Sequence, residues 1–138
     1  MLSMFFTSVI VNAYPDVEKN TYANEAITVL SDLGILNGFE DGTFKPEDTV
    51  TRAQMAKVIC RCLGYEEVSL GETVFTDVAP EHWAAGCINI AYGLKIINGN
   101  GDGTFSPEDS VTYEQAIKMI VCALGYEPMA ASKGGWYQ

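Results

Sequence analysis

Residues 37–48 read Asn-Gly-Phe-Glu-Asp-Gly-Thr-Phe-Lys-Pro-Glu-Asp, and residues 98–109 read Asn-Gly-Asn-Gly-Asp-Gly-Thr-Phe-Ser-Pro-Glu-Asp. The two stretches lie 61 residues apart. With this shift residues 14–66 align with residues 75–127 without a gap, and 24 of the 53 aligned positions are identical. Such repetition indicates a fold that uses one structural unit twice. We therefore predict two repeats, at 14–66 and 75–127, joined by a linker at 67–74.

Each repeat predicts a helix, then a loop, then a second helix. Before the loop, apolar residues recur at helical spacing. These residues are Ala23, Ile27, Leu30 and Leu33 in the first copy, and Ala84, Ile88, Ala91 and Leu94 in the second. The loop contains Asn-Gly and Asp-Gly pairs, which are typical of turns.

The second helix of each repeat has clear start and stop signals. Thr51 and Gln54 stand three residues apart and fit a capping box, and Gly64 fits a left-handed helix end. The equivalent residues of the second copy are Thr112, Gln115 and Gly125. We predict an all-α fold of two helix-loop-helix units. A unit of about 50 residues buries little apolar surface, so the units should pack on one another.

The composition is that of an acidic globular protein. The 138 residues include 8 Lys+Arg and 18 Asp+Glu, for a net charge of −10, and 48% are hydrophobic. Disordered acidic chains contain far fewer apolar residues. Nucleic acids and anionic membranes select basic surfaces, so neither is an expected partner. No apolar run reaches the roughly 18 residues of a membrane helix.

The two ends of the chain carry further signals. Residues 1–13 form a short apolar stretch that ends in a small residue, which favours the remnant of an export signal; the alternative is an apolar first helix. Residues 128–138 contain Gly-Gly-Trp-Tyr and predict either a tail or the opening of a third repeat. A third repeat or a homo-oligomer would complete the core.

Four cysteines raise the question of disulfides in an exported chain. Cys60 and Cys62 stand two residues apart and face different sides of a helix, so they cannot pair. Cys87 and Cys122 occupy apolar positions of the helical pattern. We predict small buried side chains rather than a disulfide framework or a zinc site.

The order of the motifs resembles the S-layer homology (SLH) domain. The first copy carries Asp16-Val17, Tyr22-Ala23, Gly34-Ile35-Leu36-Asn37-Gly38, Asp41-Gly42-Thr43-Phe44-Lys45-Pro46 and Thr51-Arg52-Ala53-Gln54. The second carries Asp77-Val78, Trp83-Ala84, Lys95-Ile96-Ile97-Asn98-Gly99, Asp102-Gly103-Thr104-Phe105-Ser106-Pro107 and Thr112-Tyr113-Glu114-Gln115. Several elements in the same order twice are a far more specific signal than one short motif.

The resemblance implies both a fold and a function. SLH repeats usually come in threes and form a pseudo-threefold helical prism, with binding grooves between neighbouring units. They anchor exported proteins to a bacterial cell wall by binding secondary cell wall polysaccharide non-covalently, and this glycan often carries pyruvate ketals. The expected location is therefore outside the cell, at the wall or S-layer. No cofactor is expected.

Arg52 is the leading candidate for contact with such a glycan. A pyruvylated sugar carries a carboxylate, which a forked guanidinium binds well. Arg52 follows the cap residue Thr51, beside helix N–H groups that would also favour an anion. The second copy has Tyr113 at this position, so we expect it to hold a charged sugar less well. The alternative for Arg52 is a solvated helix residue paired with a carboxylate.

The remaining candidates come from the same motifs. They are Asp16, Tyr22, Gly34, Ile35, Gly38, Asp41, Gly42, Thr51, Asp77 and Trp83. Glycines let a ligand approach the backbone, and the two aromatic rings could cover an apolar sugar face. Structural alternatives remain open: Trp83 as a core residue, the aspartates as turn formers or helix caps. His82 belongs to no motif and is expected to be exposed.

Calcium binding is the main competing function. Residues 98–103 resemble the front of an EF-hand loop and Asp109 takes its twelfth place, so a dockerin-like docking module is the alternative. Against it, the first place is Asn98, and the equivalent loop of the first copy has Phe39, which cannot bind a metal.

Catalysis is the third hypothesis and has the least support. The sequence has no nucleophile elbow, zinc-protease, P-loop or dinucleotide motif. The acid pairs Glu47-Asp48 and Glu108-Asp109 precede helix starts, where acids are favourable for structural reasons. We predict no enzyme activity.

Overall fold

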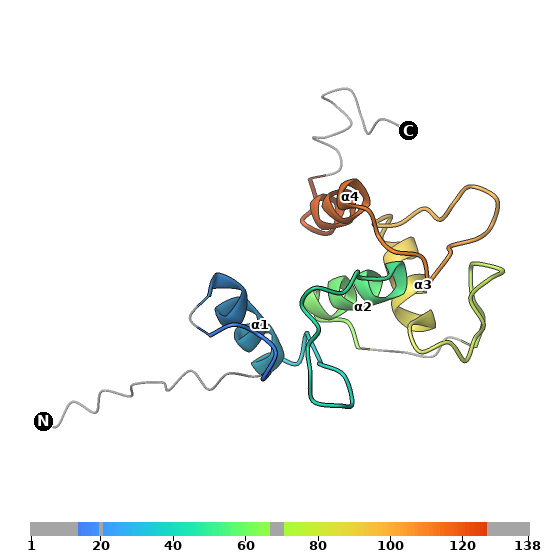
Figure 1. Cartoon of the computed structure of the whole chain (residues 1–138). Helices are drawn as coiled ribbons and strands as arrows, with labels where there is room; N and C mark the ends of the chain where they lie inside the picture. The colour runs from blue at the N-terminus through green and yellow to red at the C-terminus, as the bar shows by residue number, and fades with distance from the viewer. Residues whose placement is uncertain (1–13, 20, 67–70, 127–138) are drawn as a thin grey trace, which may run out of the picture. The chain divides into compact units, whose positions relative to one another are not determined.

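The computed structural model describes residues 14–19, 21–66 and 71–126. This part of the chain holds four helices and no strand (Figure 1), which confirms the predicted all-α class. The helices are α1 (Tyr22–Asp32), α2 (Arg52–Cys62), α3 (Ala85–Gly93) and α4 (Tyr113–Ala123). The predicted export signal at 1–13 and the predicted tail at 128–138 lie outside the described residues.

The chain divides into two compact units. The first unit ends at Asp48 and contains α1 and the loop that follows it. The second begins at Thr49 and contains α2, α3 and α4, with α2 packed against the other two helices. The division falls inside the first sequence repeat, before its second helix. The repeat boundaries, drawn from the alignment alone, therefore stay a prediction.

Both predicted capping boxes are present. The Thr51 hydroxyl accepts a hydrogen bond from the N–H of Gln54 at 3.2 Å, and the Gln54 amide oxygen accepts from the N–H of Thr51 at 2.8 Å. Thr112 and Gln115 make the same reciprocal pair at the start of α4. The predicted left-handed helix ends are confirmed as well, with φ of +77° and +78° at Gly64 and Gly125.

Lys95 occupies a position that its repeat equivalent fills with glycine. Gly34 follows α1 with φ +70°, and Lys95 follows α3 with φ +61°. A side chain in this left-handed region costs roughly 1–2 kcal/mol, while glycine adds about 0.5–1 kcal/mol of chain entropy to the unfolded state. We therefore expect Lys95→Gly to raise the free energy of unfolding by about 0.5–1 kcal/mol.

Urea titration measures the change as a higher midpoint with an unchanged slope. The reverse change, Gly34→Lys, is the matched control and should lower the midpoint. A Lys95→Gly variant no more stable than the parent would contradict the assigned strain.

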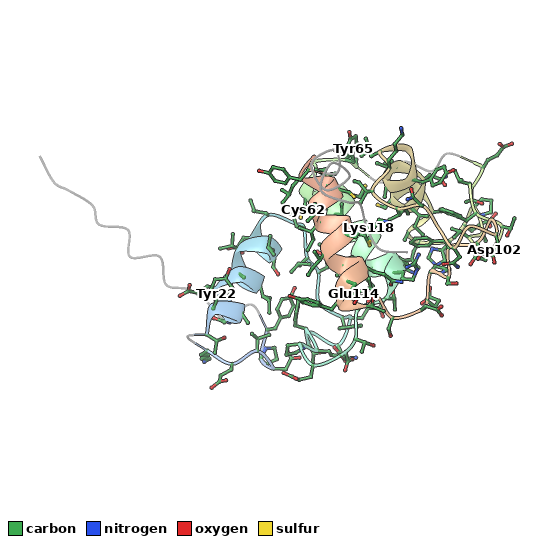
Figure 2. The ribbon with its side chains drawn as sticks, turned by 90° about the horizontal axis from the view of Figure 1, so that it is seen from above. Tyr22, Cys62, Tyr65, Asp102, Glu114 and Lys118 are labelled. Atoms are coloured by element: carbon green, nitrogen blue, oxygen red, sulfur yellow. The ribbon has the colours of Figure 1, made fainter. Side chains whose placement is uncertain are left out.

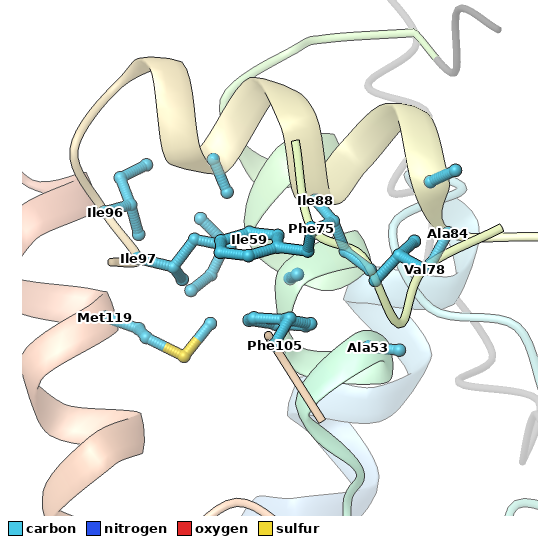
Figure 3. Packing of buried hydrophobic residues seen from close by; sticks show 13 residues of the cluster. Ala53, Ile59, Phe75, Val78, Ala84, Ile88, Ile96, Ile97, Phe105 and Met119 are labelled. Carbon is cyan, nitrogen blue, oxygen red and sulfur yellow. The ribbon is translucent and has the colours of Figure 1, made fainter. Parts of the chain in front are cut away.

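The core of the second unit is centred on Phe105. Its side chain is fully buried, as are those of Val78 and Ile88. The ring of Phe75 stacks on Phe105 with centroids 5.3 Å apart, and Figure 3 shows Ala53 and Met119 to either side of Phe105. Phe105 belongs to the loop between α3 and α4, so the core fixes this loop against the start of α2.

None of the four cysteines, all of which lie in the described ranges, is recorded in a disulfide. Cys60 and Cys87 are buried and Cys122 is half-buried, as predicted for small apolar side chains. The prediction is wrong for Cys62, which is exposed near the end of α2.

Candidate functional site

An aspartate from the start of each repeat fixes the loop of that repeat. Asp77 accepts hydrogen bonds from the N–H groups of Phe105 (2.8 Å) and Ser106 (2.7 Å). Asp16 does the same for Phe44 (2.9 Å) and Lys45 (2.7 Å). The alternative that these aspartates cap the first helix of each repeat is therefore wrong.

The cap positions themselves are held by other residues. Thr21 caps α1 by accepting from the N–H of Asn24 at 3.1 Å, and Ala84 at the start of α3 offers no side-chain cap.

The tips of both loops are closed by a second aspartate. Asp41 Oδ1 accepts from the N–H of Thr43 at 3.0 Å and from its hydroxyl at 2.6 Å. Asp102 makes the same two bonds with Thr104. These contacts match the turn-former alternative.

Three of these carboxyls link stability to pH. Hydrogen bonds from Thr43 and Thr104 lower the pKa of Asp41 and Asp102, respectively. Desolvation raises the pKa of Asp16, but hydrogen bonds from the N–H groups of Phe44 and Lys45 outweigh it and the net pKa is lowered. A carboxyl with a lowered folded pKa stabilises the fold above its unfolded pKa, about 3.9 for Asp, and loses that contribution as pH falls through the folded value.

We therefore expect the thermal midpoint to hold above about pH 5 and to fall below about pH 4. Thermal melts between neutral pH and pH 2.5 measure this change. Asp102→Asn should make the acid-induced decrease smaller. A midpoint that is the same at neutral pH and at pH 2.5 would refute the linkage.

Arg52 is fixed by the loop of the following repeat. Its Nε donates to the Phe105 carbonyl at 2.8 Å, and its guanidinium carbon lies 4.7 Å from the centroid of the Phe105 ring. The N–H of the same residue donates to Asp77, so Arg52 and Asp77 bind the two backbone groups of Phe105. Because Nε is used, the Nη1–Nη2 end of the guanidinium remains as the edge for bidentate contact with a carboxylate.

The charge of Arg52 is partly removed from water. Burial lowers the pKa of Arg52, and the nearby charges of Asp109 and Asp77 raise it. The guanidinium stays protonated at neutral pH. None of the described acidic side chains forms an ion pair with it. The arrangement leaves a half-buried positive charge that an anionic ligand could neutralise.

The N–H groups at the start of α2 are already used. Arg52 N donates to the Asp109 carbonyl and Ala53 N to the Pro107 carbonyl, both at 2.9 Å. Gln54 N is taken by Thr51. The expectation that free helix N–H groups beside Arg52 would attract an anion is therefore wrong. The guanidinium alone remains for that contact.

Trp83 lies on the surface next to a second basic side chain. It is 47% exposed, so the core alternative is wrong. The Lys57 ammonium lies 5.0 Å from the indole centroid, within cation–π range. Sequence reasoning missed Lys57, although the alignment places Lys118 at the same position of the second repeat.

His82 orients this aromatic and is not exposed as expected. Its ring stacks on Trp83 with centroids 5.4 Å apart and is half-buried. His82 Nδ1 accepts from the N–H of Ala84 at 3.2 Å, and Nε2 lies 3.1 Å from a Glu108 carboxylate oxygen. Trp83 is thereby linked to the loop that also holds Arg52.

The other candidates lie in the first unit. The glycines among them are explained by backbone conformation and close packing. Gly34 and Gly42 have positive φ, and a Cβ on Gly38 would collide with the ring of Tyr14 and the carbonyl of Thr43. Ile35 is half-buried. Tyr22 is 88% exposed and projects from the start of α1 (Figure 2).

The predicted candidates thus fall into two sets. Thr51, Arg52, Asp77 and Trp83 are in the second unit. Asp16, Tyr22, Gly34, Ile35, Gly38, Asp41 and Gly42 are in the first.

The loop that resembles an EF-hand is closed by its own side chains. Asn100 donates to the hydroxyls of Thr104 and Ser106, both at 2.9 Å, and Asp102 binds Thr104. Within the described ranges, no three His, Cys, Asp or Glu side chains cluster as a metal site would require. The geometry gives no support to the calcium alternative. The described residues also include no helix with the length and apolar character needed to cross a bilayer.

Comparison with known proteins matches the repeat. The family model for the S-layer homology domain fits residues 13–56 and again residues 74–117. A surface layer protein of Brevibacillus choshinensis is 41% identical over 78% of the chain and 10% of its own length. A middle cell wall protein of Brevibacillus brevis is 38% identical over 88% of the chain and 11% of its own length.

A cellulosome-anchoring protein of Acetivibrio thermocellus is 39% identical over 56% of the chain. The match covers 18% of that protein. The chain thus spans about a tenth of the length of the two Brevibacillus proteins.

Proposed function

Because this chain belongs to the S-layer homology domain family, we propose that it is a non-catalytic anchoring module that binds an acidic cell wall polysaccharide at Arg52. The three relatives described above are named as a surface layer protein, a middle cell wall protein and a cellulosome-anchoring protein. The predicted family and the predicted location at the bacterial cell surface are both confirmed. The glycan, its acidic group and the residues that bind it are the proposal.

The single observation that supports this proposal is the fixed position of the Arg52 guanidinium. The Phe105 carbonyl accepts a hydrogen bond from Nε of Arg52, and the Phe105 ring lies against the face of the guanidinium. A fixed guanidinium loses little further entropy on binding and presents two N–H donors in the plane of a carboxylate. The chain as a whole has a net charge of −10 and repels anions, so the attraction for an anionic group comes from the positive charge at Arg52 itself.

Trp83 and Lys57 extend the proposed site. An exposed indole can cover the apolar face of a sugar ring while the polar edges of the sugar stay hydrated. The Lys57 ammonium beside the indole adds a second positive charge. A sugar that carries a carboxylate, such as a pyruvate ketal, would place its charge at the Nη end of Arg52 and a ring on Trp83.

The second repeat is proposed to lack this charged contact. Tyr113 stands where the first repeat has Arg52, and its side chain is 81% exposed. We therefore expect the two repeats together to bind one acidic group of the glycan, through Arg52. The cargo that the module anchors, and a third repeat or second copy as its partner, are also proposals.

The experiment is retention of the purified chain on cell wall sacculi. Two preparations are compared, one intact and one stripped chemically of its acidic groups. We expect the chain to sediment with the intact sacculi and to remain soluble with the stripped ones. Equal retention on both would show that an acidic group is not recognised.

A further inference from the structure

The peptide group between Phe105 and Ser106 is bound at both of its ends. Its C=O accepts a hydrogen bond from Nε of Arg52 at 2.8 Å, and its N–H donates to Oδ2 of Asp77 at 2.7 Å. The peptide bond is trans, so these two groups point in opposite directions. Asp77 and Arg52 therefore hold one planar group from opposite sides, and in the described part of the chain no ion pair joins the two side chains directly.

The backbone of Ser106 has a conformation that requires such support. Its φ is +56°, in the left-handed region that residues with a Cβ rarely adopt. Ser106 also precedes Pro107, and a residue before proline normally prefers an extended backbone. Both oxygens of Asp77 accept backbone N–H groups here, from Phe105 at 2.8 Å and from Ser106. These two hydrogen bonds hold the peptide group in its strained arrangement, because such strain persists only where surrounding contacts impose it.

The rest of this loop is attached to the start of α2 by other contacts. The carbonyls of Pro107 and Asp109 accept backbone N–H groups from the first turn of the helix. Ser110 Oγ donates to Thr49 Oγ1 at 3.1 Å, and these two residues are equivalent positions of the two repeats. None of these bonds involves Asp77. Loss of the Asp77 carboxylate should therefore reorient one peptide group and leave the loop attached to the helix.

Electrostatics alone predicts that Asp77 weakens the binding of an anion. Burial lowers the pKa of Arg52, and the charges of Asp109 and Asp77 raise it, so both carboxylates act on the guanidinium. A carboxylate near a cationic site repels an anionic ligand, and its removal should strengthen binding. The two acids differ in one respect, since Asp77 accepts the N–H of the peptide group that binds Arg52. This difference allows an effect of charge to be separated from an effect of position.

We propose that Asp77 is a positioning residue for the anion-binding guanidinium of Arg52 and acts through the peptide group between Phe105 and Ser106. The inference rests on the proposed binding of an acidic glycan at Arg52. Asp77 fixes the direction of the Phe105 carbonyl, and this carbonyl fixes Nε, so the Nη1–Nη2 edge keeps one orientation. The side chain is thus ordered before the ligand arrives. One carboxylate thereby strengthens the binding of another, because its effect on orientation exceeds its repulsion.

Binding isotherms on intact sacculi test the sign of this effect. Asp77→Asn keeps the shape of the side chain but directs an amide N–H₂ at one backbone N–H, so the peptide group loses its clamp. We expect the affinity to fall by about threefold to tenfold, since an unfixed side chain must be ordered on binding. Asp109→Asn is the matched control, because it removes the same charge without touching the clamp, and it should bind about twofold more tightly. Asp16→Asn breaks the equivalent clamp of the first repeat and should bind as the parent chain does.

NMR of the free chain distinguishes positioning from direct contact with the glycan. The sequence has two arginines, so the Nε–H region of a heteronuclear spectrum has two signals, and Arg61 is an internal reference. We expect the Arg52 Nε–H of the parent chain to exchange slowly with water, and Asp77→Asn to accelerate this exchange by about tenfold or more. Asp109→Asn and Asp16→Asn should leave the exchange slow. Thermal melts establish that each variant is folded.

Three results would overturn the proposal. Binding by Asp77→Asn that equals or exceeds that of the parent chain would show that charge outweighs position. Rapid exchange of the Arg52 Nε–H in the parent chain would show that the guanidinium is not fixed, and this measurement needs no variant to fold. Weaker binding by Asp77→Asn with unchanged slow exchange would show that Asp77 contacts the glycan directly. The proposed function itself fails only if Arg52→Ala binds as well as the parent chain, which none of these results requires.

Discussion

Arg52→Ala is expected to abolish most retention on acidic cell walls. A hydrogen bond to a charged group is worth about 1.5–3 kcal/mol, which corresponds to a loss of affinity of roughly tenfold to a hundredfold. The loss should be larger than for an exposed arginine, because the guanidinium is half-buried and held by Phe105. Binding isotherms on intact sacculi measure it.

Two matched variants show whether the guanidinium itself is responsible. Arg61→Ala removes an arginine from the last turn of the same helix and should retain full binding. Arg52→Lys keeps the charge but loses the bidentate edge, so it should recover only part of the affinity. If Arg52→Ala binds as well as the parent chain, Arg52 is not the contact and the proposed site is wrong.

Phe105→Ala is expected to cost the most stability of any single change. Truncation of a fully buried phenylalanine typically lowers the free energy of unfolding by about 3–5 kcal/mol. Phe105 is 0% exposed and stacks on Phe75. Its loss leaves a cavity and removes the ring beneath Arg52. Denaturant titration of the parent and the variant measures the difference.

Phe44→Ala is the natural control for this change. Phe44 has the same place in the first repeat and the same aspartate clamp, but it is only half-buried. We expect its truncation to cost clearly less, about 1–2 kcal/mol. Equal losses for the two variants would show that the loops are buried alike, against the exposures observed here.

The helices and their ends could be predicted because their signals are local. Thr51 and Gln54 form a capping box from residues three apart, and Gly64 ends α2 through its own backbone freedom. The repeat added the second copy of each element. The family could be recognised for the same reason, since its motifs are short and occur twice in order.

The surroundings of the candidate site could not be predicted in the same way. Arg52 meets Phe105, a residue 53 positions away, and its N–H binds the Asp109 carbonyl. Periodicity and propensity contain no information on such pairs, because tertiary packing decides them. The same holds for His82, whose partner Glu108 lies 26 positions away. For Lys57, the identity with Lys118 was a usable signal that the helical pattern concealed.

The distance along the chain between Ser110 and Thr49 equals the length of one repeat. This contact joins equivalent positions of two successive repeats, so such a join does not depend on how many repeats, or blocks of 61 residues, precede or follow it. Addition of a whole block of 61 residues leaves an existing join in place, because the join depends on the residues that make contact and not on the number of blocks. The number of blocks can therefore change during evolution, or by deliberate grafting, without redesign of the parts.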